Sequence, residues 1–198
     1  VLVGAQTHAE EVSRVHGGDT YIAGDTVTEA LTAPGDVFTA GSTITTSGSA
    51  SGDIHAAGFD VNVATQTGGD IYAAGSTVSI EAPVSEDITA AGFSVRTTTN
   101  ATTGGNARLF GRNVTVEGPV SGALSAFAGN VHLNAVITGD AWIAAETVTF
   151  GPAARIDGRL TLTTETDTAV PERVIPAARI TVEEWDRPEM MREFSESW

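Results

Sequence analysis

The stretch Gly69-Asp70-Ile71-Tyr72-Ala73-Ala74-Gly75 decides the fold, because the chain returns to this pattern of residues along most of its length. Each unit has glycine and a carboxylate, then an apolar residue, then small residues that lead to a second glycine. Successive units lie 17 residues apart, or 19 where two residues are inserted, within Thr97–Thr103 and again before Gly158. The other units begin at Gly18, Gly35, Gly52, Glu86, Gly105, Gly122, Gly139 and Gly158.

Two further columns of residues keep the same step, and most of their members are apolar. Polar residues alternate with the apolar ones, which predicts short strands and excludes a helical repeat. The columns are Val27, Ile44, Val61, Val78, Val95, Val114, Val131 and Val148, and Ala50, Thr67, Val84, Val120, Ile137 and Ile156.

Three short strands per repeat predict an all-β fold, a single-stranded right-handed parallel β-helix in the form of a triangular solenoid. We expect about nine coils of 17 residues, stacked about 4.8 Å apart, because one coil alone cannot bury its apolar side chains. Val37, Ile54, Ile71, Ile88 and Leu124 should point inward in the first strand of each coil, with Ala56, Ala73, Ala90 and Leu109 two residues further on.

The composition narrows the classes of partner and site. The formal net charge is −15 and the chain has no lysine, so nucleic acid is not an expected partner. It has no cysteine, which excludes disulfides, thiolate metal sites and a cysteine nucleophile. Only 6% of the residues are aromatic, so a column of aromatic residues is informative.

The two ends of the chain depart from the repeat. Residues 1–9 resemble the end of a secretory signal cut after Ala9, which predicts an exported protein of the periplasm or cell envelope, although an ordinary apolar strand is the alternative. Residues 10–182 form the expected solenoid, and the pattern weakens from Pro171 onward. Residues 183–198 form a short helical tail, either a cap or a segment leading to a missing membrane anchor, in which Met190, Phe194 and Trp198 share one face.

The edge of the stack near Val12 to Ile22 shows no cap in the sequence. An uncovered strand edge can pair with another chain, so this end is the expected surface for self-association.

An outward column is the strongest candidate for a binding surface. Strand alternation places Tyr21, Phe38, His55 and Tyr72 on the outside of four consecutive coils, followed by Thr89, Arg108, Ser125 and Trp142. This column is a candidate surface for an envelope protein or a glycan. The alternatives are ring stacking that stabilises the coils, or cover by the C-terminal tail.

The carboxylates of the repeat form a second column: Asp19, Asp36, Asp53, Asp70, Asp87 and Asp140. Calcium could neutralise such a row, but aspartate after glycine is also an ordinary turn residue. We therefore predict no metal site and no cofactor. The four histidines are scattered and no template for catalysis is filled, so we expect no enzyme activity and no catalytic residues.

The repeat resembles the bactofilin or polymer-forming cytoskeletal family, and most closely its exported, membrane-anchored relatives. The resemblance lies in Gly69–Val78 and in Gly118-Pro119-Val120-Ser121-Gly122, and it extends from Gly17 to about Val182. It implies a non-catalytic scaffold that associates end to end and recruits partners. The alternative is a carbohydrate-binding or adhesive solenoid, because the fold does not fix the function.

Overall fold

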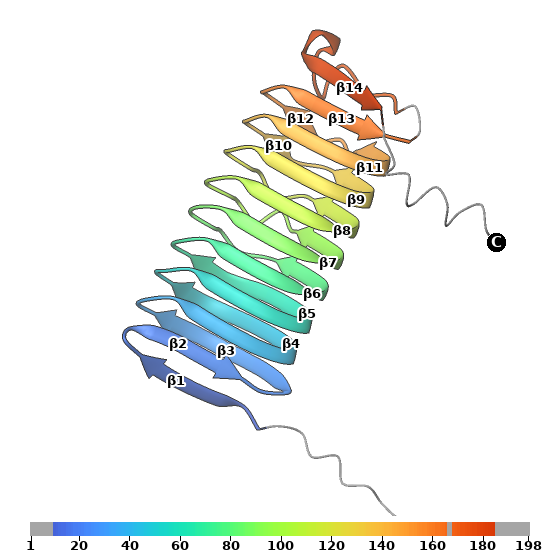
Figure 1. Cartoon of the computed structure of the whole chain (residues 1–198). Coiled ribbons are helices and arrows are strands. Elements are labelled where there is room, and N and C mark those ends of the chain that lie inside the picture. Colours follow the sequence, from blue (N-terminus) through green and yellow to red (C-terminus); the bar gives the residue numbers. More distant parts are fainter. Residues whose placement is uncertain (1–9, 166–167, 185–198) are drawn as a thin grey trace, which may run out of the picture.

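The computed structural model describes residues 10–165 and 168–184. Parallel coils stack along one axis into a β-solenoid of about ten turns (Figure 1). The predicted β-helix is therefore confirmed, with one more turn than the repeat indicates. The predicted signal remnant (residues 1–9) and most of the predicted tail, with Met190, Phe194 and Trp198, lie outside the described residues.

One strand of each turn belongs to a long sheet that runs the length of the rod. Along this sheet the order is β1 (Val12–His16), β2 (Asp19–Ala23), β4 (Val37–Ala50), β5 (Ile54–Thr67), β6 (Ile71–Ile80), β7 (Ile88–Thr97), β8 (Ala107–Val116), β9 (Leu124–Leu133), β11 (Ala141–Phe150), β13 (Leu160–Thr164) and β14 (Ile180–Glu184). The remaining elements are β3 (Thr26–Ala33), β10 (Val136–Ile137), β12 (Arg155–Ile156) and the short 3-10 helix η1 (Ala177–Arg179).

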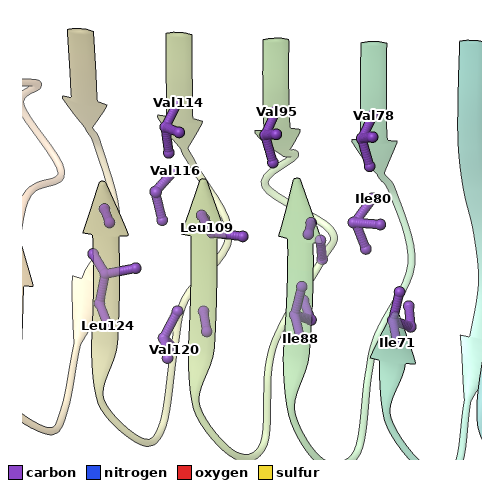
Figure 2. Close-up of a cluster of buried hydrophobic side chains, with 14 of the residues drawn as sticks. Ile71, Val78, Ile80, Ile88, Val95, Leu109, Val114, Val116, Val120 and Leu124 are labelled. Carbon is purple, nitrogen blue, oxygen red and sulfur yellow. The ribbon is translucent and has the colours of Figure 1, made fainter. Parts of the chain in front are cut away.

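Residues one repeat apart occupy equivalent places in neighbouring coils. Val78 pairs with Val61 on one side and with Val95 on the other, and all three side chains are buried. Figure 2 shows Val78, Val95 and Val114 in one row along the inside of the stack, with Ile71, Ile88 and Leu124 in a second. Every residue that the sequence places in the three inward columns is buried, so the inward assignment is confirmed.

Glycine is required where the long strands turn a corner. A Cβ atom on Gly58 would lie 2.4 Å from the backbone oxygen of Gly41 in the preceding coil. A side chain at this place would push the coils apart, because ordinary contacts need more than 3 Å. The second glycine of the repeat thus allows one strand to continue from the first face of the coil to the next.

The N-terminal edge of the stack is covered at β2, where the expectation of an uncapped edge is wrong, whereas β3 pairs only with β4 among the described strands. Strand β1 pairs antiparallel with β2, from Val12 opposite Ala23 to His16 opposite Asp19. Gly17 and Gly18 form the turn between these strands with positive φ angles of 66° and 101°, which glycine adopts readily. The strands that face this end of the rod are therefore β1, whose side chains are all exposed, and β3.

The C-terminal end contains one further coil, so the expectation that the repeat weakens from Pro171 is wrong up to Glu184. Val174 and Ile175 are buried, and the carbonyl oxygen of Val174 accepts a hydrogen bond of 2.8 Å from the backbone N–H of Ile156. Strand β14 then pairs parallel with β13. Within residues 10–165 and 168–184, no helix is long and apolar enough to cross a membrane.

An apolar groove beside a ladder of stacked rings

The four aromatic and imidazole rings of the predicted outward column form a stack, here called the ring ladder (Tyr21, Phe38, His55 and Tyr72). Neighbouring ring centroids are 5.1, 4.6 and 5.0 Å apart, and the planes differ by only 2–8°. The parallel register of β2, β4, β5 and β6 causes this geometry, because it places equivalent side chains directly above one another. The alternative of ring stacking between coils is thus present in the structure.

The ring ladder is anchored to the carboxylate column at one point. The Tyr72 hydroxyl donates a hydrogen bond of 2.9 Å to Oδ2 of Asp70. This bond and the nearby negative charge favour the neutral phenol, so they raise the pKa of Tyr72 above its usual value. The contact also shows that the tip of the Tyr72 ring reaches the row of aspartates.

A row of alanines lies beside the ring ladder and is here called the alanine floor (Ala23, Ala40, Ala57, Ala74 and Ala91). The first four alanines lie two residues beyond the four ladder residues and Ala91 lies two residues beyond Thr89; all five face outward and are exposed. The strands pair these alanines in register. The next residue in this row is Phe110, which stacks on Phe127 at 5.5 Å. Two large rings thus end the run of small side chains.

The ring ladder and the alanine floor together line an open groove of about 710 Å³. Val12 and Arg14 of β1 line its N-terminal end, and Thr89 and Ala91 lie at the other. Ring carbons and alanine methyl groups form most of its surface, so it favours apolar ligands. The alanine floor was not predicted from the sequence as part of a binding surface, because small residues on the outer face of a strand carry no distinctive chemistry. The signal was its constant offset of two residues from the rings, which strand alternation places on the same face.

The carboxylate column holds successive coils together through the backbone. Oδ1 of Asp53 accepts a hydrogen bond of 2.8 Å from the N–H of Asp70, and the Asp70 carboxylate does the same for Asp87. The pattern also includes Asn106, whose Oδ1 accepts the N–H of Ala123 at 2.9 Å. The carboxylates therefore act as hydrogen-bond acceptors for the backbone of the next coil, rather than for their own local backbone as in an ordinary turn. No group of three or more metal-binding side chains occurs within the described residues.

These carboxylates also explain the first glycine of the repeat. A Cβ atom on Gly69 would lie 2.1 Å from Oδ1 of Asp53. Glu86 takes the place of glycine one coil later, and its N–H lies 3.3 Å from the oxygen of Gly69, the longest such bond in this row. Glycine and aspartate thus form one unit that spans two coils.

The local charges near Asp87 differ from those near the other aspartates. Its carboxylate accepts the N–H of Asn106 at 2.6 Å and pairs with Arg108 at 2.9 Å. These bonds, led by the backbone hydrogen bond, stabilise the ionised form and lower the pKa of Asp87. The outward column therefore changes from rings to a charged pair beyond Thr89.

His55 and His132 lie in different parts of the solenoid. His55 lies between Phe38 and Tyr72 in the ring ladder, and Nδ1 of His132 lies 2.9 Å from the Thr149 hydroxyl on another face. Trp142 belongs to the outward column but lies three coils beyond Thr89, where its ring meets Phe127 edge-on at 4.7 Å.

Comparison with known proteins finds no match to this chain among protein-family models, curated proteins or solved structures. The bactofilin resemblance therefore rests on the motifs quoted above and stays a hypothesis.

Proposed function

We propose that this chain is a non-catalytic, bactofilin-like scaffold of the cell envelope, which recruits partners along the flank of a rigid rod. The observation that supports this proposal is the exposed groove between the ring ladder and the alanine floor. Contiguous apolar surface on a soluble domain typically marks an interaction site. The long sheet beneath it fixes the position of every lining residue, so the groove is formed before a partner arrives.

A protein partner fits this groove better than the carbohydrate of the alternative proposal. Sugars bind to the flat faces of aromatic rings and need hydrogen-bonding groups for their hydroxyls. In the ring ladder the faces of Phe38 and His55 are covered by neighbouring rings, which leaves only the outer faces of Tyr21 and Tyr72. Alanine methyl groups on the floor offer no hydrogen bonds.

Self-association is a second part of the proposal and involves the ends of the rod. Because β1 covers β2, another chain would add to the outer edge of β1. Val15 on β1 is 71% exposed, and a Val15→Lys variant should place a charge at this contact. If the wild type grows in size with concentration in sedimentation velocity, this variant should stay monomeric. A wild type that is monomeric at all concentrations would contradict end-to-end association.

The recruitment proposal is tested with a variant that fills the groove. Ala57 is exposed on the alanine floor, so Ala57→Gln should obstruct binding without disturbing the core. Ala144→Gln is the matched control, because Ala144 occupies the same column beyond Phe127. We expect wild-type protein and the control to retain the same partner from an envelope extract, and Ala57→Gln to lose it. Retention by all three proteins would contradict recruitment through the groove, and a glycan-dependent signal lost in Ala57→Gln would favour the carbohydrate alternative.

A further inference from the structure

We propose that the groove binds an amphipathic α-helix whose polar face carries lysine or arginine, supplied by a partner protein. This inference rests on the proposed recruitment of partners and adds the shape and charge of the segment that is bound. Three observations lead to it: the apolar lining, the length of the alanine floor and the row of carboxylates beside the ring ladder.

The lining favours a helix over an extended peptide. The groove runs across the strands, whose backbone groups are already used in the bonds between coils. An extended peptide along the groove would lose water from its own N–H and C=O groups and find few acceptors or donors in return. A helix satisfies these groups internally and presents only side chains, so it suits a lining of rings and methyl groups.

The dimensions of the alanine floor match a short helix. From Ala23 to Ala91 the floor crosses five neighbouring coils, which corresponds to a length of about 19 Å at a spacing of about 4.8 Å. A helix rises about 1.5 Å per residue, so about 13 residues cover this length. The small methyl groups of the floor leave room for large apolar side chains from successive turns of such a helix.

The charges beside the groove select a cationic polar face. The Asp70 carboxylate contacts the tip of the Tyr72 ring, and Asp36, Asp53 and Asp87 occupy the equivalent place in neighbouring coils. Positive charge near the groove is limited: Arg14 lies at its N-terminal end, and Arg108 is paired with Asp87. Together with the net charge of −15, this row attracts a basic helix and repels anionic lipid head groups.

The C-terminal segment of this chain is a poorer match to the groove. Met190, Phe194 and Trp198 would share one face if this segment were helical, but residues 185–198 contain four acidic residues and two arginines. Its charge is thus of the same sign as the carboxylate row. A basic segment from another protein therefore fits the charges better.

The test uses a labelled 16-residue peptide of leucine and lysine in helical periodicity, with fluorescence anisotropy on the full chain. Two control peptides have the same composition in scrambled order, or glutamate in place of lysine. Wild-type protein and Ala144→Gln should bind the amphipathic cationic peptide equally, and Ala57→Gln should bind it about tenfold more weakly or worse. The scrambled peptide and the glutamate peptide should bind far more weakly than the cationic helix.

The charge requirement is tested without disturbing the coils. Asparagine can replace the aspartate acceptor, as Asn106 shows, so Asp53→Asn should keep the bond between coils. We expect it to weaken binding about two- to fivefold. Asp140→Asn, in the same column but remote from the groove, should leave binding unchanged.

Equal binding of the scrambled peptide, or no effect of Ala57→Gln, would overturn the proposal. Binding that appears only in a Phe194→Asp/Trp198→Asp variant would also overturn it, because the groove would then hold this chain's own C-terminal segment. If the peptide fails to bind but Ala57→Gln still loses an envelope partner, the cationic helix is refuted and recruitment stands. If the peptide fails to bind and Ala57→Gln also keeps the envelope partner, the proposed recruitment through the groove fails as well.

Discussion

Replacing Val78 with aspartate would place a carboxyl group between two coils, in the middle of the rod. The Val78 side chain is fully buried and lies between Val61 and Val95 in the neighbouring coils (Figure 2). The change removes a buried side chain worth about 1.5 kcal/mol or more. It also buries a polar group without a partner, which costs about 2–7 kcal/mol even for a neutral group. The free energy of unfolding should therefore fall by about 4 kcal/mol or more.

This loss is large enough to be measured by thermal melting with circular dichroism. A domain of this size loses about 2–4 °C in Tm for each kcal/mol, so the Val78→Asp variant should melt at least about 8 °C below wild type. Thr77→Asp is the control, because Thr77 is the exposed neighbour on the same strand. Asp60 lies opposite Thr77, so the control should lose less than about 1 kcal/mol through repulsion. A Val78→Asp variant that melts within about 3 °C of wild type would refute the inward column and the stacked fold.

Three further predictions concern the ring ladder and the carboxylate column. Gly69→Ala should lower the free energy of unfolding by about 2–4 kcal/mol in urea denaturation, because its methyl group displaces the Asp53 carboxylate. If Gly69→Ala lowers the free energy of unfolding by the same amount in an Asp53→Ala background, the clash with this carboxylate is not the cause. Phe38→Ala should cost about 1–3 kcal/mol through the loss of both ring contacts, whereas Phe38→Tyr should melt close to wild type. The folded-state pKa of Asp87 is lowered, chiefly by the backbone hydrogen bond from Asn106 and also by Arg108, so the stability that the ionised carboxylate gives the wild type over Asp87→Asn should be present above about pH 4. This stability should be lost as the pH falls through the lowered pKa, so a difference in Tm that does not shrink on acidification would exclude the ionised carboxylate as its source.

The inward columns could be predicted from the sequence because burial in a solenoid recurs at a fixed step. Val61, Val78 and Val95 lie one repeat apart and alternate with polar residues, which is enough to place them inside. Thr103 shows the limit of this reasoning. It is buried in the third column between Val84 and Val120, but it is polar and follows an inserted turn, so the pattern of apolar residues misses it.

The two ends could be predicted less well, because the repeat fails there. The antiparallel strand β1 has no counterpart in other coils, yet Gly17-Gly18 between two alternating segments is a known hairpin signal that would have indicated it. At the other end, Leu160 and its partner Ile180 lie 20 residues apart instead of 17 or 19, and this irregular step hides the last coil. The groove depends on which outward side chains are large and which are small in adjacent columns, so it becomes visible only when the register is known.

The bonds between aspartate carboxylates and the N–H groups of the next coil also bear on how such a protein can evolve. In the coils from Asp19 to Asp87, each coil presents the same acceptor to its successor and the same N–H donor to its predecessor, so a duplicated copy of Gly52–Gly68 would fit between its neighbours without altered contacts. Every duplication would lengthen the molecule by about 4.8 Å and add one ring and one alanine to the groove. Tandem gene duplication could thus set the length of the binding surface in fixed increments, independently of its chemistry.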